Sequence, residues 1–225
     1  MCSALWRLQG AGYLAMCVLA VALGLYPHLA YVSPGAGGAA LPALSILAAG
    51  QVLFALVVWP LAQLHRAGSS AAGGTADNAA AGAVELLGWL LATVPFYVAA
   101  GWVADATVGD VVRVAMYVAA VWTLPLAAGT WCTGPRSDTG AARGAWGMLL
   151  GLLVVALGGP AVYYIAAEFA TPSAAAVVAR VAPAVHAWQL ASFRGSWLPE
   201  PRWCVLLWPA LAGVAALTRL ALRRR

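Results

Sequence analysis

Charged side chains are scarce in this chain, and three of them stand together in one short stretch, "TWCTGPRSDTGAARGAW", between Thr130 and Trp146. Arg136, Asp138 and Arg143 interrupt long runs of Leu, Val and Ala that resume on both sides. Arginine in a short loop between apolar runs is typical of the cytoplasmic side of a membrane protein. We therefore expect this loop to face the cytoplasm.

Residues that commonly catalyse reactions or bind cofactors are few. The chain has no GxSxG, no HExxH and no clustered acid pair, and because it has no lysine it lacks a standard Walker A motif. We expect a protein that is not an enzyme, with no metal and no cofactor. The cysteines are too far apart for a CxxC motif, which predicts a packing role for Cys2, Cys17, Cys132 and Cys204.

A few polar side chains fall within or beside the apolar runs. Gln51, Tyr163 and Tyr164 are candidates for lining a transport path, and packing between helices is the alternative. His28 and His186 are expected on the same side of the membrane, which leaves open a third hypothesis, a haem- or quinone-binding protein. Because polar groups are so few, a hydrophobic cargo is the preferred one for a transporter.

Composition identifies the elements that must position these residues. Of 225 residues 64% are hydrophobic and 8% charged, whereas soluble domains average roughly 45–50% and about 25%. We predict an all-α integral membrane protein with a single transmembrane domain over residues 1–225. The net charge of +5 does not indicate nucleic acid, because the arginines lie at the ends of apolar runs rather than along a stripe.

Six segments are long and apolar enough to cross a bilayer as helices, which requires about 20 residues each. None shows the alternation of a barrel strand. The predicted spans are Ala11–Val32, Leu41–Leu64, Ala83–Ala104, Gly109–Trp131, Gly144–Ala167 and Trp203–Leu222. Each contains at least one proline that could act as a hinge, a residue that is also common in membrane helices generally: Pro27, Pro60, Pro95, Pro125, Pro160 and Pro209.

The connections between these spans differ in character. His65–Gly82 is polar and rich in Ala, Gly and Ser, and we expect a flexible loop; "DATVG" is a tight turn. Asp110 and Arg113, which follow that turn, are three residues apart and can pair on one helix face. The segment Glu168–Arg202 is the longest connection and is too amphiphilic for a plain linker, and we expect one or two short helices there.

The positive-inside rule orients the chain. With both termini in the cytoplasm, eight arginines fall inside and four fall outside, and the four outside are Arg113, Arg180, Arg194 and Arg202. The segment from Glu168 to Arg202 is then external. We predict a multi-pass protein of the cell inner (cytoplasmic) membrane.

The order of these features resembles the membrane subunit of type-2 ABC transporters, the ABC-2 permease family. The resemblance is carried by "VELLGWLLATVPFYVAAGWVADATVGDVVRVAMYVAAVWTLPLAAGTWCTGPRSDTGAARGAWGMLLGLLVVALGGP", by the external segment 168–202 and by the basic end "RLALRRR". It implies six spans, both ends inside and short outer helices between spans five and six. It also implies a separate ATP-binding cassette ATPase subunit as partner, and a second permease copy or paralogue in a dimer.

If the resemblance holds, the charged residues of the inner loops are the candidates for coupling to that ATPase: Arg66, Asp77, Glu85, Arg136, Asp138 and Arg143. The same arginines also satisfy the topology rule without any partner. The loop His65–Gly82 departs from the family, which has a stretch rich in Glu and Arg there. This departure favours an alternative function, a non-transporting scaffold or accessory subunit of a membrane complex.

Overall fold

The computed structural model describes residues 2–29, 43–62, 75–132, 139–192, 207–215 and 217, and every regular element in these ranges is a helix. This confirms the predicted all-α class. Backbone N–H and C=O groups in so apolar a chain are best satisfied inside a single segment, which is the arrangement that an α-helix provides.

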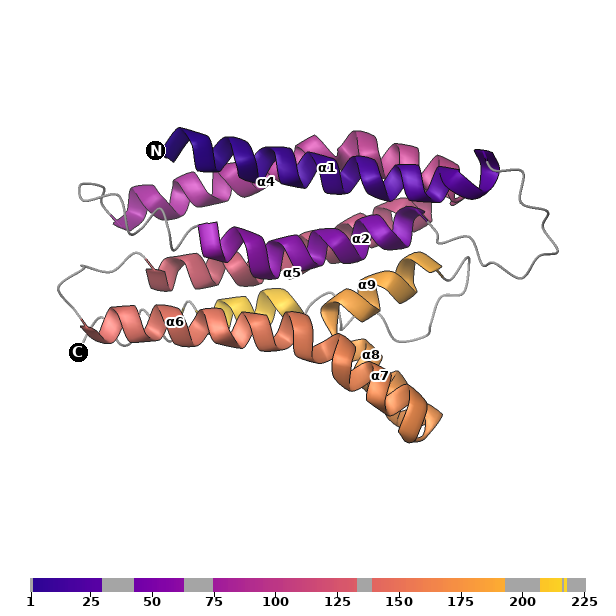
Figure 1. The fold of residues 1–225 in the computed structure, drawn as a ribbon. Helices are drawn as coiled ribbons and strands as arrows, with labels where there is room; N and C mark the ends of the chain where they lie inside the picture. Colours follow the sequence, from indigo (N-terminus) through magenta and orange to yellow (C-terminus); the bar gives the residue numbers. More distant parts are fainter. Residues whose placement is uncertain are drawn as a thin grey trace.

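Long helices lie side by side and neighbours in the chain run in opposite directions (Figure 1). They are α1 (Cys2–Leu29), α2 (Ala43–Leu53), α4 (Thr75–Val103), α5 (Val108–Cys132) and α6 (Thr139–Leu153). The π-helical segment η1 (Phe54–Val58) continues α2 to residue 62, and η2 (Val154–Gly158) joins α6 to α7 (Gly159–Phe169). The described long helices of the bundle therefore alternate in direction along the chain, and a further helix follows at 207–215.

The segment that follows α7 forms two short helices, α8 (Pro172–Val181) and α9 (Pro183–Ser192). α7 and α8 pack against each other and diverge from the bundle, whereas α9 returns to it and packs against α2 and α5 (Figure 1). The prediction of short helices in the segment 168–202 is confirmed for the part that the structure describes.

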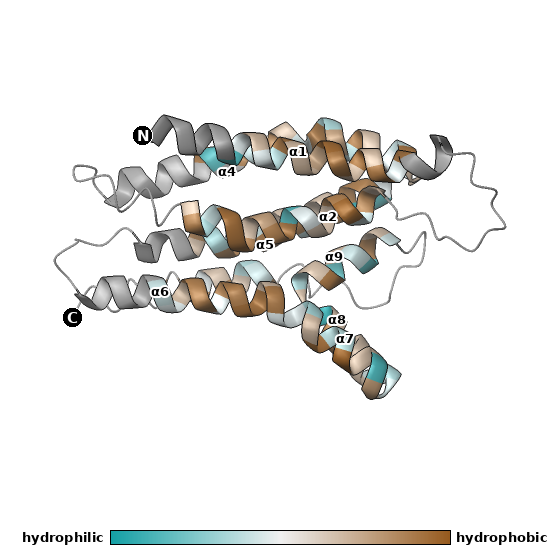
Figure 2. Ribbon diagram, viewed as in Figure 1, coloured by the Kyte–Doolittle hydropathy of each residue, from teal (hydrophilic) through white to brown (hydrophobic). Residues whose placement is uncertain are grey.

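Three of the helical stretches within the described residues are long and apolar enough to cross a membrane, namely 43–62, 108–127 and 146–169. Shorter apolar stretches occur at 9–25, 87–103 and 172–181. Brown, hydrophobic residues extend along most of the helices of the bundle (Figure 2). In 146–169 only 17% of the apolar window is buried, so this stretch lies at the periphery with its apolar side chains facing outward.

The start of α4 differs from the prediction. Helix begins at Thr75, so the last eight residues of the expected loop His65–Gly82 are helical. The reason is local, because "TADNAAAG" contains four alanines, the residue with the highest intrinsic helix propensity. α6 likewise begins at Thr139, five residues before the predicted Gly144.

The prolines act in two ways. Pro95 and Pro125 lie inside α4 and α5 without ending either helix. Pro60 and Pro160 each follow a π-helical segment, and after η1 the Trp59 N–H bonds to the Phe54 carbonyl five residues earlier. A proline ring collides with the carbonyl four residues before it, and the wider π turn relieves that collision.

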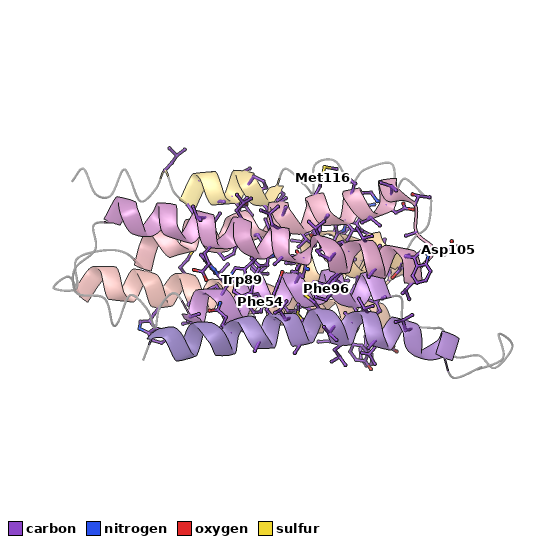
Figure 3. All side chains as sticks on the ribbon, turned by 90° about the horizontal axis from the view of Figure 1, so that it is seen from above. Phe54, Trp89, Phe96, Asp105 and Met116 are labelled. Carbon is purple, nitrogen blue, oxygen red and sulfur yellow. The ribbon has the colours of Figure 1, made fainter. Side chains whose placement is uncertain are left out.

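Aromatic rings fill the middle of the bundle. Tyr13 of α1 contacts Phe54 and Trp89 with ring centroids 4.5 and 4.8 Å apart, and Trp122 of α5 stacks on Phe54 at 6.2 Å. Viewed from above, Phe54 and Trp89 lie in the bundle interior, far from Asp105 at one end (Figure 3). This aromatic cluster joins α1, η1, α4 and α5.

Helices α1 and α2 approach closely at Gly24. A Cβ atom at this position would lie 2.3 Å from the Ala43 Cβ and 2.9 Å from its Cα. Small residues at such a contact allow membrane helices to pack through their backbones. Gly12 of the same helix has nothing within 4 Å of the position that its Cβ would take.

We therefore expect Gly24→Ala to destabilise the folded protein by about 1–3 kcal/mol, because α2 would have to move away to admit the methyl group. Gly12→Ala is the matched control and should be neutral or slightly stabilising, since alanine is the better helix former. The midpoints of thermal unfolding in detergent measure both effects. Equal midpoints for the two variants would contradict the close contact at Gly24.

Candidate functional site

The candidate coupling residues fall only in part within the described structure. Arg66, Arg136 and Asp138 lie outside the described residues. Asp77 is the third residue of α4 and Arg143 the fifth residue of α6. The starts of α4 and α6 lie at the end of the bundle where α1 also begins (Figure 1). We refer to this end as the terminal end.

Glu85 lies two turns farther along α4 and is partly buried. Its Oε1 atom accepts a hydrogen bond from the indole Nε1 of Trp89 at 3.3 Å, one turn away on the same helix. The indole belongs to the aromatic cluster, so this carboxylate is tied to the bundle core. Of the six coupling candidates, Glu85 is the one whose side chain the structure describes.

The three candidate path-lining residues are not brought together. Gln51 is fully buried in α2, and the Tyr97 hydroxyl donates to its Oε1 atom at 2.9 Å. Tyr163 and Tyr164 lie on α7, where Tyr163 accepts a bond from Gln189 Nε2 at 3.4 Å and Tyr164 is 63% exposed. Gln51 thus faces the interior of this single chain, whereas Tyr164 faces outward.

A small polar cluster surrounds Gln51 inside the bundle. The Cys17 thiol of α1 interacts with the Gln51 amide, and the Tyr13 hydroxyl lies against Thr93. The Thr93 hydroxyl donates back to the Leu90 carbonyl at 2.7 Å, in the manner usual for threonine inside a helix. Polar contacts of this kind fix how helices meet where lipid supplies no competing water.

Replacing Tyr97 with Phe should cost about 1 kcal/mol of stability, because the buried Gln51 carbonyl loses its donor. Tyr164→Phe removes the same hydroxyl from an exposed ring and should leave stability unchanged. A double-mutant cycle with Gln51→Leu, followed by unfolding in mixed micelles, isolates the Tyr97–Gln51 coupling. Additive effects of the two substitutions would refute the bond.

The start of α5 carries a second polar group. Thr107 and Asp110 bond reciprocally, with the Thr107 backbone N–H donating to Asp110 Oδ2 at 3.3 Å and the Asp110 N–H donating to Thr107 Oγ1 at 3.2 Å. This is a capping box, which satisfies donors that the first helical turn leaves free. Asp110 also forms an ion pair with Arg113 at 2.9 Å, which confirms the pairing predicted from their spacing.

Arg113 and Tyr117 connect α5 to α9. Arg113 Nη2 donates to the Leu190 carbonyl at 3.3 Å, and the Tyr117 hydroxyl donates to the Pro183 carbonyl at 3.4 Å. Tyr117 also accepts a bond from the indole Nε1 of Trp208, in the last described helix, at 3.2 Å. These bonds hold both ends of α9 on the bundle, at the end opposite the terminal end (Figure 1).

His186 of α9 is buried against this connection. Its ring lies 4.8 Å from that of Tyr117, and neither ring nitrogen has a hydrogen-bond partner among the described residues. Burial lowers the pKa of the His186 imidazole to about 4, and the charge of Arg180 on α8 acts in the same direction. The imidazole is therefore neutral near pH 7.

Sequence reasoning overlooked Tyr117, Trp208 and Ser45, all of which position α9. The Ser45 and Ser192 hydroxyls bond at 2.9 Å across 147 residues of sequence. No local pattern signals a contact at such a separation. Within the described part of the chain, no three His, Cys, Asp or Glu side chains are grouped closely enough to hold a metal ion.

Comparison with known proteins does not identify a family for this chain. The chain matches no protein-family model, no curated protein and no solved structure.

Proposed function

We propose that this chain is the membrane-spanning permease subunit of an ABC-type exporter of the ABC-2 kind, in which a separate ATPase subunit drives alternating access. The observation that carries the proposal is the order of the helices. Long apolar helices alternate in direction, and two short helices, α8 and α9, stand between the fifth and sixth helical stretches. This is the layout that the family resemblance implies.

Six crossings of the membrane are part of the proposal. α1 has 28 residues and α4 has 29, so each is about 42 Å long at 1.5 Å per residue. That exceeds the roughly 30 Å of a bilayer's hydrocarbon core. We propose that these two helices, the stretches 43–62, 108–127 and 146–169 and the predicted span Trp203–Leu222 make six crossings, with both termini on one side.

The terminal end is the proposed docking surface for the ATPase. We place this end in the cytoplasm, with the chain in the inner membrane, because the positive-inside rule puts the side richer in arginine there. The starts of α4 and α6, which carry Asp77 and Arg143, lie there. In the sequence Arg66 precedes α4, and Arg136 and Asp138 precede α6, outside the described residues. A cytoplasmic ATPase can reach this surface without entering the bilayer.

The proposed transport path runs between two permease copies. Gln51 and its neighbours are packed inside one chain, so the polar side chains that the structure describes there form contacts between helices rather than the lining of a path. A path at the boundary between two copies would be lined by the outward-facing apolar residues, which suits a hydrophobic cargo. This is the form of the dimer that the family resemblance implies.

The burial of Gln51 also favours a second candidate function, a scaffold or accessory subunit that moves no substrate. Such a subunit needs only helix packing, and the polar side chains inside this bundle serve packing. It requires no ATPase contact at the terminal end.

Expression of the chain together with its genomic neighbours distinguishes the two functions. We expect a tagged chain, purified in mild detergent, to bring with it a subunit that carries a Walker A motif and hydrolyses ATP. A chain purified with other membrane proteins, without any ATP-hydrolysing subunit, would refute the permease function and support the scaffold.

A further inference from the structure

The helical hairpin formed by α7 and α8 is only loosely embedded in the rest of the molecule. Each of its two helices has one buried residue, Ala166 in α7 and Ala179 in α8. The hairpin diverges from the bundle while its two helices pack side by side (Figure 1). Its remaining side chains are exposed or half-buried, so its packing is mainly internal.

The tip of the hairpin is tightly built. Two residues, Ala170 and Thr171, join α7 to α8. The Ala170 N–H bonds back to the Ala166 carbonyl, and the Thr171 hydroxyl caps α8 by accepting the Ala174 N–H at 3.4 Å. Pro172 in the first turn of α8 is already set for helix. These features make the two helices one stiff unit.

Regular α-helix is interrupted at both of the chain connections at the base of the hairpin, while the Ala182 N–H still bonds to the Val178 carbonyl at 2.9 Å. On one side η2 leads into Gly158, Gly159 and Pro160, and proline supplies no N–H to the carbonyl of Ala156 four residues earlier. On the other side Ala182 separates α8 from α9 in an extended conformation (φ −86°, ψ 104°), as expected for a residue that precedes a proline.

The two chain connections at the base of the hairpin contact each other. A Cβ atom on Gly159 would lie 2.9 Å from the Ala182 Cβ and 3.2 Å from its Cα. Because Gly159 has no side chain, the segment that enters the hairpin and the segment that leaves it can lie in contact here. The two interruptions of regular α-helix therefore lie together at one corner, at the base of the hairpin.

Beyond this corner, α9 is firmly attached. Ser192 bonds to Ser45 of α2, and Leu190 and Pro183 accept bonds from Arg113 and Tyr117 of α5. The hydrogen bond from Gln189 to Tyr163, at 3.4 Å, connects α9 to α7 and restrains movement of the hairpin relative to α9.

We propose that α7 and α8 form a rigid arm that pivots as one body on the corner between Gly159 and Ala182, while α9 stays fixed to the bundle. The arm is a moving part at the end opposite the terminal end. It does not depend on the proposed permease function, since a scaffold with this structure would have the same arm.

Distances between pairs of spin labels test the pivot in the full chain in lipid nanodiscs. The four native cysteines are first replaced, and labels are placed at exposed residues: Trp146 on α6, Val108 at the start of α5, Tyr164 on α7 and Val177 on α8. The pair 146–108 lies within the bundle and serves as the control. The pairs 146–164 and 146–177 cross the proposed hinge.

We expect both cross-hinge distance distributions to be broader than the control, by roughly twofold, because the helix lacks a hydrogen bond at Pro160. Gly159→Ala should shift the mean of both cross-hinge distances together. The matched variant Gly158→Ala should leave the means in place, since its Cβ would meet only Val154 Cγ1, at 3.7 Å.

Tyr163→Phe provides a second test if Gly159→Ala does not accumulate. It removes the hydroxyl that Gln189 contacts and should broaden the cross-hinge distributions further, with 146–108 unchanged. Cross-hinge distributions as narrow as the control in the unsubstituted protein would overturn the proposal, as would independent shifts of the 146–164 and 146–177 distances.

Discussion

Trp122→Ala should destabilise the protein by roughly 2–4 kcal/mol, mostly through the cavity that it leaves. The Trp122 side chain is fully buried and its ring contacts Phe54 and Tyr13 at 6.2 and 6.3 Å. Helices in lipid gain little from leaving water together, so van der Waals packing supplies most of their association. Removing this ring therefore weakens the contact of α5 with both α1 and η1.

Two variants separate packing from other effects of losing a tryptophan. Trp102 on α4 is 83% exposed, and Trp102→Ala should change stability by no more than about 0.5 kcal/mol. Trp122→Phe keeps a ring and removes an indole N–H that has no hydrogen-bond partner among the described residues, so it should cost less than Trp122→Ala. Unfolding in mixed micelles gives all three values, and equal losses for Trp122→Ala and Trp102→Ala would contradict the aromatic cluster.

Acidification should destabilise the protein through His186. The pKa of this imidazole is about 4 in the fold, compared with 6.5 for an unperturbed histidine, because burial disfavours its charge. The unfolded chain therefore binds a proton between these values and the folded chain does not. The stabilisation is complete above pH 6.5 and is lost as the pH falls toward 4.

The size of this loss follows from the same pKa. A tenfold change in proton affinity corresponds to about 1.4 kcal/mol, so the difference between 6.5 and about 4 corresponds to about 3 kcal/mol at full effect. Tyr117 of α5 and Arg180 of α8 are the titratable or charged groups that act on His186 within the described residues.

His186→Gln is the matched variant, because glutamine keeps a polar side chain and does not titrate. The midpoint of thermal unfolding should fall more steeply between pH 7 and pH 4.5 for the unsubstituted protein than for the variant. Parallel curves would show that another group controls the response to acid.

The helices could be predicted from the sequence because apolar length alone specifies them. Stretches such as Leu41–Leu64 and Gly109–Trp131 have no alternative to helix in a bilayer, and both are helical wherever the structure describes them. The pair Asp110–Arg113 was predictable for the same reason, since i,i+3 spacing brings two side chains to one face of a helix.

The connection of α9 to the bundle could not be predicted. The bonds from Tyr117 to Pro183 and from Trp208 to Tyr117 span 66 and 91 residues of sequence. Their partners are ordinary residues with no shared motif, and only the three-dimensional path of the chain brings them together. The same holds for Gln51, a candidate path-lining residue from its type, whose bond to Tyr97 spans 46 residues and lies inside the bundle.

The early start of α4 could not be predicted from apolar length. The residues 75–82 are not apolar enough to be assigned to a membrane span, yet alanine extends the helix through them. Asp77 consequently lies on a helix that continues into the bundle rather than in a free loop.

The most direct test of the permease function is the retention of an ATPase by loop variants. The chain, its variant with both Arg136→Ala and Arg143→Ala, and the control Arg194→Ala are each co-expressed with the genomic neighbours and purified in detergent. The ATPase should accompany the unsubstituted chain and the Arg194→Ala control, and should be lost from the double variant. An unsubstituted chain that purifies without any ATPase would contradict the proposed function.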